Sequence, residues 1–252
     1  MLTIRQKKII RLLEDLGGSA TIDNLMTKLY ISKSTLRRDL ISLEKTSVVQ
    51  RFHGGVGLVE SGATESPISK RRMQNLIKKS FIAHLAGKLL HDNMVIFLDS
   101  SSTVNELCPL IRHFQNITVI TNGINIAEQL NFYQNITCYI CPGTVKHKSL
   151  SIIGQYAIDF IGNFTADAVF LSSKAILPNG IFEGDDAQAL IKRAMMRQAK
   201  KIYLLCDDTK ESTSGFFKLE DYRRIDLLLT SQPLSPTLSQ IISEEGCKIV
   251  YE

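Results

Sequence analysis

The stretch SKSTLRRDLISLE, from Ser32 to Glu44, decides the first part of the fold. Its leucines Leu36, Leu40 and Leu43 recur at helical spacing, which places them on one face of a helix. Ser32 is a favourable N-cap residue, and the face opposite the leucines carries basic and hydroxyl side chains. Such a helix docks on its neighbours through the leucines and presents a surface suited to a polyanion.

Two shorter helices are predicted before this one, and a β-hairpin after it. Thr3 to Gln6 has the form of a capping box and is followed by apolar residues at helical spacing, and Thr21 can cap a second helix. Two β-prone runs flank Gly54-Gly55, which indicates a two-stranded wing. Three helices and a wing are typical of a winged helix-turn-helix, whose third helix enters the major groove of DNA.

Nine residues of this region are candidates for contacts with DNA. Arginine can bind guanine through two hydrogen bonds, hydroxyl groups can bind phosphate or base edges, and an isoleucine can contact the thymine methyl group. Residues near the start of the third helix are expected to contribute most, and two residues beside the wing turn could reach phosphate or the minor groove. The candidates are Ser32, Lys33, Ser34, Thr35, Arg37, Arg38, Ile41, Arg51 and His53.

The charge is unevenly distributed along the 252 residues. Residues 1–80 contain 15 Lys and Arg against 7 Asp and Glu, whereas residues 81–252 contain 15 against 18. A basic first third favours nucleic acid or another anionic surface as a partner, although a solvated basic face would give the same count.

The composition excludes several classes of protein. No apolar stretch approaches the roughly 20 residues of a membrane span, and the N-terminus lacks the apolar run of a signal peptide, so we expect a cytoplasmic protein that does not bind membranes. The five cysteines lie in apolar stretches, which favours reduced, buried thiols without disulfides. Cys138 and Cys141 form a CxxC pair, but too few ligands lie nearby for zinc and the pair does not open a helix, so neither a metal nor a cofactor is predicted.

The remainder of the chain predicts an α/β domain with a mostly parallel sheet. Short β-branched runs alternate with amphipathic helical segments, which is the pattern of a parallel sheet covered by helices. The predicted strands are 94–98, 117–121, 136–140, 167–171, 201–206 and 225–230.

Polar side chains follow several of these strands directly. Asp99 and a run of hydroxyls follow the first strand, Thr121-Asn122 ends the second, and Asp207 and Lys210 follow the fifth. Parallel sheets bind ligands beyond the carboxyl ends of their strands. Cationic and N–H groups for a phosphate, together with acceptors for hydroxyls, would suit a sugar phosphate, although each turn taken alone could be an ordinary helix cap.

The predicted domains are 1–60 for the winged helix, 61–69 for a linker and 70–252 for the α/β domain. The stretch 61–69 is small, polar and contains a proline, which is linker composition. Helical periodicity resumes over 70–90, where a hinge helix could pack on the second domain. Its Lys and Arg residues could add weak affinity for DNA or simply be solvated.

Both halves resemble the DeoR family of bacterial sugar-metabolism regulators. The stretches RQKKIIRLL, ISKSTLRRDLISLE and RFHGGV are similar to its winged helix-turn-helix, and FLDSSST, TVITNGINIAEQL, IKRAMMRQAKKIYLLCDDTK and IDLLLT to its effector domain, which is similar in fold to ribose-5-phosphate isomerase. The resemblance implies sequence-specific DNA binding, usually repression, and a phosphosugar pocket. The pocket residues that it implies are Asp99, Ser101, Ser102, Thr103, Thr121, Asn122, Lys174, Lys192, Asp207 and Lys210, of which Lys192 could equally lie on a helix surface.

The chain departs from the family pattern at three places. Cys141-Pro142-Gly143 stands where a glycine pair is common, LSSKAI replaces the glycines of the next loop, and Gln188 stands where an acidic residue is usual. Proline removes an N–H group that could hold an anion. The pocket is therefore expected to be retuned.

The resulting hypothesis is a non-enzymatic transcription regulator that represses genes of sugar uptake or catabolism. It would bind double-stranded operator DNA and respond to a phosphorylated sugar, as a homo-oligomer, either dimer or tetramer, because repeated operators favour symmetric readers. One alternative is a sugar-phosphate isomerase with an accessory DNA-binding domain, in which Asp99 or Asp207 would serve as the base. Another is a regulator whose pocket has lost its ligand.

Overall fold

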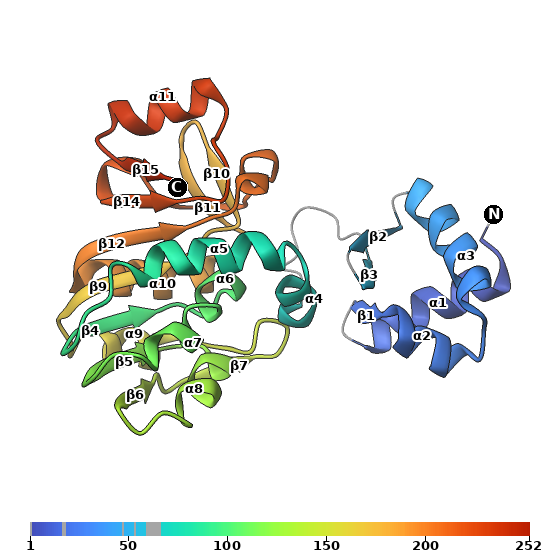
Figure 1. Ribbon diagram of the computed structural model, residues 1–252, viewed down its shortest axis with the longest axis horizontal. Helices are drawn as coiled ribbons and strands as arrows, with labels where there is room; N and C mark the ends of the chain where they lie inside the picture. Colours follow the sequence, from blue (N-terminus) through green and yellow to red (C-terminus); the bar gives the residue numbers. More distant parts are fainter. Residues whose placement is uncertain (1, 17–18, 47, 53, 59–66) are drawn as a thin grey trace. The chain divides into compact units, whose positions relative to one another are not determined.

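The computed structural model describes residues 2–16, 19–46, 48–52, 54–58 and 67–252, with only the backbone of Glu14 and Phe52. The chain divides into two compact units, Met1–Leu76 and Ile77–Glu252 (Figure 1). Each unit has its own core, which is expected for domains of this size.

The first unit is the predicted winged helix-turn-helix. Its helices are α1 (Ile4–Asp15), α2 (Ile22–Leu29) and α3 (Lys33–Lys45). The capping box is present, because the Thr3 N–H donates to Gln6 Oε1 at 2.9 Å and the Gln6 N–H donates to Thr3 Oγ1 at 3.2 Å. The predicted apolar faces meet in one core, which contains Ile9, Leu13, Ala20, Leu25, Leu36, Leu40, Leu43, Val49 and Val56.

The wing has three strands rather than the two predicted. Strands β2 (Val49–Phe52) and β3 (Gly55–Leu58) form the hairpin, and β1 (Ser19–Thr21) adds to β3 in antiparallel register. Three residues are too few for a periodic pattern, so the sequence alone does not reveal β1.

The helix predicted over 70–90 is in fact two helices. Helix α4 (Ile68–Met73) begins inside the predicted linker and belongs to the first unit, whereas α5 (Leu76–Gly87) leads into the second. Gln74 is extended and Asn75 has a φ of +54°, a left-handed conformation that interrupts a helix. Lys70 is buried, and its ammonium donates to the carbonyl oxygen of Leu58, so this lysine fixes α4 on the wing.

The second unit is a seven-stranded parallel sheet with helices on both faces. The strand order is β15-β14-β12-β9-β4-β5-β6, and every neighbouring pair is parallel. All six predicted strands are present, and β15 is an additional one. The strands are β4 (Val95–Leu98), β5 (Ile117–Thr121), β6 (Ile136–Ile140), β9 (Ala166–Leu171), β12 (Ala199–Leu205), β14 (Leu227–Leu229) and β15 (Lys248–Val250).

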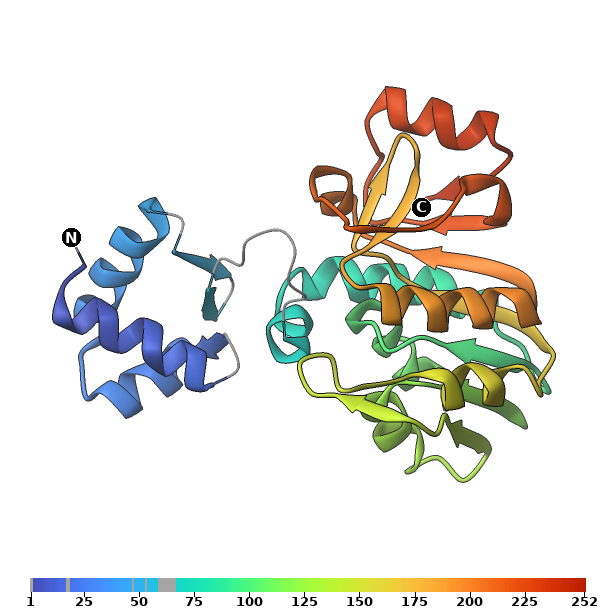
Figure 2. The ribbon, with the colours of Figure 1, turned by 180° about the vertical axis from the view of Figure 1, so that it is seen from behind.

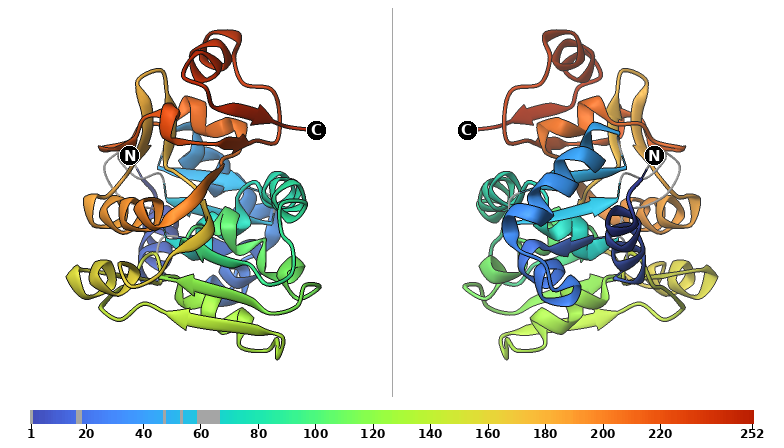
Figure 3. Two further views of the ribbon diagram at one scale, coloured as in Figure 1. Left: turned by 90° about the vertical axis from the view of Figure 1, so that its left-hand side faces the viewer. Right: turned by 90° about the vertical axis from the view of Figure 1, so that its right-hand side faces the viewer.

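Helices cover the two faces of the sheet with separate apolar cores. The core on one face contains side chains of α9 (Gln155–Ile161), α10 (Asp186–Gln198) and α11 (Pro236–Glu244). The core on the opposite face contains side chains of α5, α6 (Ser102–Asn105), α7 (Cys108–Ile111) and α8 (Ile124–Leu130) (Figures 2 and 3). This double cover explains why the strands read as nearly continuous apolar runs.

Short antiparallel elements lie outside the main sheet. Strands β7 (Thr144–Lys146) and β8 (Ser151–Ile153) form a hairpin. Strands β10 (Ala175–Leu177), β11 (Gly180–Glu183) and β13 (Phe217–Glu220) form a small sheet. Two 3-10 helices, η1 (Asp208–Ser212) and η2 (Tyr222–Arg224), complete the unit. Gly143, before β7, has a φ of +144°, and a Cβ there would lie 2.6 Å from the Ile153 carbonyl oxygen, so this turn requires glycine.

The strand order reverses at β4. From β4 the chain continues to β5 and β6 on one side, and β9 then pairs with the other side of β4. The carboxyl ends of strands on either side of such a switch point form the usual ligand crevice of a doubly wound sheet.

Candidate functional site

The start of α3 gathers three hydroxyl groups. The Thr35 N–H donates to Ser32 Oγ at 3.3 Å, and Ser32 Oγ is also 3.1 Å from Ser34 Oγ and 2.9 Å from Thr35 Oγ1. Ser32 and Ser34 are exposed and Thr35 is half-buried. Hydroxyls at the positive end of a 13-residue helix form a surface suited to phosphate.

The start of α3 carries three exposed cations. Lys33, Arg37 and Arg38 are exposed, and none forms an ion pair within the described ranges. Ile41 is half-buried, so only part of its side chain is available to a thymine methyl group. The three cations and the hydroxyl cluster lie within the cap and the first two turns of α3.

The inner face of α3 carries a polar anchor besides its leucines. Asp39 is buried and pairs with Arg5 of α1, whose Nη2 is 3.1 Å from Asp39 Oδ1. Hydrogen bonding to this carboxylate raises the pKa of Arg5. The pair connects the third helix to the first and fixes its rotation about its own axis.

The wing residue Arg51 has a partner that the sequence did not predict. Its Nε donates to Glu44 Oε2 at 2.7 Å, and its backbone N–H donates to Glu44 Oε1 at 3.1 Å. These hydrogen bonds lower the pKa of Glu44. Arg51 therefore fastens β2 to the end of α3, and its guanidinium would have to share or leave Glu44 to contact DNA. His53 lies outside the described residues.

The predicted effector residues gather at the carboxyl ends of four neighbouring strands. Asp99 follows β4, Thr121 and Asn122 end β5, Lys174 follows β9 and Asp207 follows β12. Buried side chains predominate among them, since Lys174 and Lys210 alone are half-buried within this predicted set.

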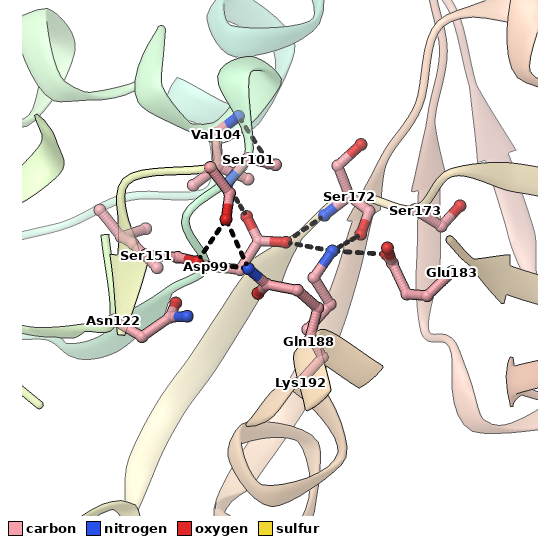
Figure 4. Close-up of polar contacts among 12 residues, drawn as sticks. Asp99, Ser101, Val104, Asn122, Ser151, Ser172, Ser173, Glu183, Gln188 and Lys192 are labelled. Carbon is pink, nitrogen blue, oxygen red and sulfur yellow. Dashed lines mark hydrogen bonds and ion pairs between the residues drawn. The ribbon is translucent and has the colours of Figure 1, made fainter. Parts of the chain in front are cut away.

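Asp99 and Lys192 form the centre of this group (Figure 4). The Asp99 carboxylate accepts the N–H groups of Ser101 at 2.9 Å and Ser172 at 3.0 Å, so it bridges the ends of β4 and β9. Lys192 Nζ lies 3.0 Å from Asp99 Oδ2. Asp99 and Ser101 follow β4, Ser172 follows β9 and Lys192 lies on α10, and the switch point brings these three segments together.

Lys192 uses its ammonium entirely within the protein. Besides Asp99, it contacts Glu183 Oε1 at 2.5 Å and the Ser172 carbonyl oxygen at 2.6 Å, which accounts for its three hydrogens. Burial disfavours the charge of Lys192, but the two carboxylates outweigh burial and raise its pKa. Lys192 is thus a positioning residue for Asp99, and Glu183, which the sequence did not single out, is its second anion.

The hydroxyl groups of two other predicted residues form hydrogen bonds with the backbone. Thr121 Oγ1 donates to the Leu98 carbonyl oxygen at 2.7 Å and accepts the Gly123 N–H at 3.0 Å. Ser101 caps α6 by accepting the Val104 N–H at 3.3 Å. The side chains of Ser102 and Thr103 are buried in the first turn of α6 and have no hydrogen bond with the described part of the chain.

A second buried polar group surrounds Gln188, which the sequence marked as a departure from the family pattern but which was not among the predicted pocket residues. Gln188, four residues before Lys192 on α10, donates through Nε2 to Ser149 Oγ at 3.1 Å and to Ser151 Oγ. Ser151 also forms an isolated β-bridge with Gly123, and the Ile152 N–H donates to the Asn122 carbonyl oxygen at 2.7 Å. The β7–β8 hairpin is therefore fastened to the end of β5.

Asp207 and Lys210 lie on the loop after β12. Asp207 caps η1 by accepting the Thr209 N–H at 3.1 Å, and the side chain of Lys210 forms no ion pair within the described ranges. The neighbouring Cys206 is fully buried; burial raises the pKa of its thiol, against hydrogen bonds with Ser173 and the nearby charge of Lys210. Lys210 is therefore a cation at the strand ends that is available to an anionic ligand.

The same loop is attached to the first helix of the second unit. Lys78 of α5 contacts Asp208 at 2.6 Å, and Ser231 donates to the same carboxylate at 2.6 Å. Lys79 is buried. Lys78 is thus paired within the second unit and Lys79 is buried, so the two lysines do not form the solvated helix face that was one of the two alternatives left open by the sequence.

A groove elsewhere on the sheet does not suit an anion. It has a volume of about 400 Å³ between α8 and the edge strand β6. It is lined by Ala127, Leu130, Asn131, Tyr133, Gln134, Ile136, Cys138 and Ile140. Because no lysine or arginine lines it, the strand ends are the better site for a phosphate.

The CxxC pair does not form a metal site in the structure. Cys138 lies in β6 and Cys141 just after it, and burial raises the pKa of their thiols to about 11 and about 12. All five cysteines are free thiols, and no metal-like grouping of His, Cys, Asp or Glu occurs among the described residues. In the same part of the chain, no helix is both long and apolar enough to cross a bilayer.

Comparison with protein families matches both units. Residues 5–62 match the DeoR-like helix-turn-helix domain, and residues 74–232 match the DeoR C terminal sensor domain. The chain belongs to the DeoR family of transcription regulators. The resemblance inferred from the sequence is therefore confirmed.

Relatives of this DeoR-family chain match it over almost their full length. The HTH-type transcriptional regulator GolR of Listeria innocua is 30% identical over 97% of this chain and 96% of its own, and the HTH-type transcriptional repressor GlcR of Bacillus subtilis is 27% identical over 98% and 96%. The glycerol-3-phosphate regulon repressor of Escherichia coli is 24% identical over 98% of each chain. Among solved structures, ribose 5-phosphate isomerase from Methanocaldococcus jannaschii matches 55% of each chain at 19% identity, with a TM-score of 0.39.

Proposed function

We propose that this DeoR-family regulator is a repressor that binds operator DNA through α3 and is controlled by a phosphorylated sugar at the strand ends of the second unit. The observation that carries the DNA part is the exposed surface at the start of α3, where Lys33, Arg37 and Arg38 have no acidic partner among the described residues and lie beside the hydroxyl cluster. The leucine face and the Arg5–Asp39 pair hold that surface in place.

The effector part is supported by the chemistry of the strand ends. Lys210 offers a cation, Lys174 lies nearby on the neighbouring strand end, and acceptors such as Asn122 and Asp207 could bind hydroxyls. The repressor names of several relatives, one of them for the glycerol-3-phosphate regulon, agree with a phosphorylated polyol as signal. The Lys78–Asp208 pair supports a route from the loop of Lys210 to α5 and hence along the chain toward the first unit.

Of the two carboxylates named as the base of the isomerase alternative, Asp99 is engaged within the protein. Both oxygens of Asp99 accept hydrogen bonds, and the carboxylate is also paired with Lys192, which leaves it poorly placed to take a proton from carbon. The relatives are named as regulators, which favours a non-enzymatic role.

A dimer that reads two operator half-sites is part of the proposal. Two recognition helices related by a two-fold axis would contact major grooves about 34 Å apart, so the operator should contain a repeated or palindromic element.

The proposal is tested by titrating the full chain onto labelled DNA from its own upstream region, at fixed salt, with a panel of sugar phosphates and the corresponding free sugars. We expect specific binding that weakens with increasing salt and that is changed by a phosphorylated sugar but not by the free sugar. Binding no tighter than to random DNA would refute the operator assignment. Specific binding indifferent to the whole panel would instead support a regulator that has lost its ligand.

A further inference from the structure

Two buried amide side chains at the strand ends have an oxygen atom that receives no hydrogen bond. Asn122 is 1% exposed and Gln188 is 3% exposed, and neither Asn122 Oδ1 nor Gln188 Oε1 has a donor among the described residues. Buried amide oxygens are almost always hydrogen-bonded in native proteins. Two such atoms among the predicted pocket elements therefore point to a ligand that supplies donors.

The orientation of the Asn122 amide is fixed by its neighbour. Its Nδ2 donates to the Ile152 carbonyl oxygen at 3.1 Å, and a carbonyl oxygen can accept but cannot donate. The amide therefore cannot be turned around, and Oδ1 is the atom left for a ligand.

The orientation of the Gln188 amide follows from the serines. Ser151 Oγ is 2.7 Å from Ser149 Oγ, which in turn lies 3.5 Å from the Lys146 carbonyl oxygen. When the Ser151 hydroxyl donates to Ser149, and Ser149 to that carbonyl, both serine oxygens can accept the Gln188 Nε2 hydrogens. Oε1 then points away from the serines and remains available.

The nitrogens of the two amides are bonded to adjacent residues of β8. Gln188 bonds to Ser151, and Asn122 is bonded to Ile152, the residue after Ser151. Figure 4 shows the two amides beside Ser151 and next to the Asp99 group. Adjacent residues of β8 thus hold both side chains near the end of β5, where Ser151 also bridges to Gly123.

We propose that Asn122 and Gln188 read neighbouring hydroxyl groups at the end of the effector remote from its phosphate, and that Gln188 is a specificity-determining residue. The inference rests on the proposed effector site. It assigns the ligand to the class of phosphorylated sugars or polyols that carry free hydroxyls at the end opposite the phosphate.

The dimensions of the sheet agree with this assignment. Lys210 follows β12, which is three strand positions from β5, or about 14 Å at the usual strand spacing. The lysine side chain covers part of that distance, and a sugar of five or six carbons with its phosphate can cover the remainder. An amide in place of the acidic residue usual in the family also leaves the hydroxyl end without an extra negative charge.

The test compares ligands that differ by one hydroxyl. Ribose 5-phosphate and glucose 6-phosphate are titrated calorimetrically into the full chain, each beside its 2-deoxy analogue, and glucose 6-phosphate also beside its 3-deoxy analogue. A site built to bind a hydroxyl leaves buried acceptors unpaired when that hydroxyl is missing, so we expect at least about tenfold weaker binding of a deoxy analogue. Equal affinity within every pair that binds overturns the inference without any mutation.

Substitutions test whether Gln188 and Asn122 cause the preference for the ligand that retains its hydroxyl. Gln188→Met and Asn122→Leu remove the acceptor oxygens at similar volume and should bring the affinities of the paired ligands to within about twofold. Gln155→Met, on the exposed surface of α9, is the matched control and should keep the preference. If both site variants keep the full preference for the ligand that has the hydroxyl, this inference fails while the effector assignment stands. If no sugar phosphate of the panel binds, the effector assignment itself fails, and the inference fails with it.

Discussion

The buried lysine of the sensor unit offers the sharpest test of the structural reasoning. Lys192→Met keeps most of the aliphatic stem and removes the ammonium that neutralises Asp99 and Glu183. Lys192 is 6% exposed and Asp99 0%, so solvent does not screen the charges that remain. Removal of one partner from a buried ion pair typically costs about 3–5 kcal/mol, because the other charge is left uncompensated.

The matched control is a surface pair on the same sheet. Lys201 Nζ is 2.8 Å from Asp226, but the two side chains are 58% and 33% exposed. Exposed pairs contribute at most about 1 kcal/mol, so Lys201→Met should change the free energy of unfolding by no more than that.

Urea unfolding followed by far-UV circular dichroism provides the assay, since the chain contains no tryptophan. The two units can unfold in separate steps, and Lys192→Met should move only the transition of Ile77–Glu252. A loss for Lys192→Met no larger than that for Lys201→Met would refute the view that Asp99 and Glu183 depend on this ammonium.

Three further predictions follow from other parts of the molecule. Arg38→Ala should weaken operator binding by about 1–3 kcal/mol without changing the circular dichroism spectrum, as measured by fluorescence anisotropy at fixed salt; unchanged affinity would move the recognition surface elsewhere. Lys210→Ala should leave DNA affinity intact and abolish its change by the sugar phosphate, and a persistent response would show that the phosphate binds elsewhere. Burial raises the pKa of both Cys141 and Cys247 to about 12, against about 8.5 in an unfolded chain, so stability should be full below about pH 8.5 and fall as pH rises toward 12. Urea midpoints at about pH 8 and about pH 10 check this, and Cys141→Ala/Cys247→Ala should show a smaller decrease.

Local patterns predicted the elements that are stabilised locally. The capping box of Thr3 and Gln6, the Ser32 cap and the leucines of α3 act over a few residues, and the structure contains all of them. The six predicted strands of the main sheet were visible for the same reason, because each lies in a run of apolar and β-branched residues, including the three-residue strand β14. The short strands β1 and β15 lie in no such run, and they form because a neighbouring strand is available.

The break between α4 and α5 lies beyond what periodicity can detect. Apolar residues continue at helical spacing through Gln74 and Asn75, yet the backbone there is extended and then left-handed. The burial of Lys70 on the wing holds α4 with the first unit, and no local signal of the sequence indicates that contact.

The sequence indicated which strand ends carry the candidate site, but it did not indicate the hydrogen bonds and ion pairs within the site. Strand-end positions identified Asp99, Asn122 and Lys210, since parallel strands place their carboxyl ends along one edge. The sequence could not show that the ammonium of Lys192 already binds Asp99 and Glu183. Lys192 lies on α10, Asp99 at the end of β4 and Glu183 on β11, and the three side chains meet only in the folded unit.

The central position of β4 also governs the order in which the chain can fold. Ile96 pairs with Ala168, so the middle of the sheet cannot close until the segments of β5 to β8 and then β9 have been made. Contacts of the first unit, in contrast, span short distances in sequence and form early. During synthesis, the DNA-reading unit would be complete on the ribosome well before the sensor sheet. A chain interrupted in between would still have its recognition helix but would lack any means of responding to the sugar.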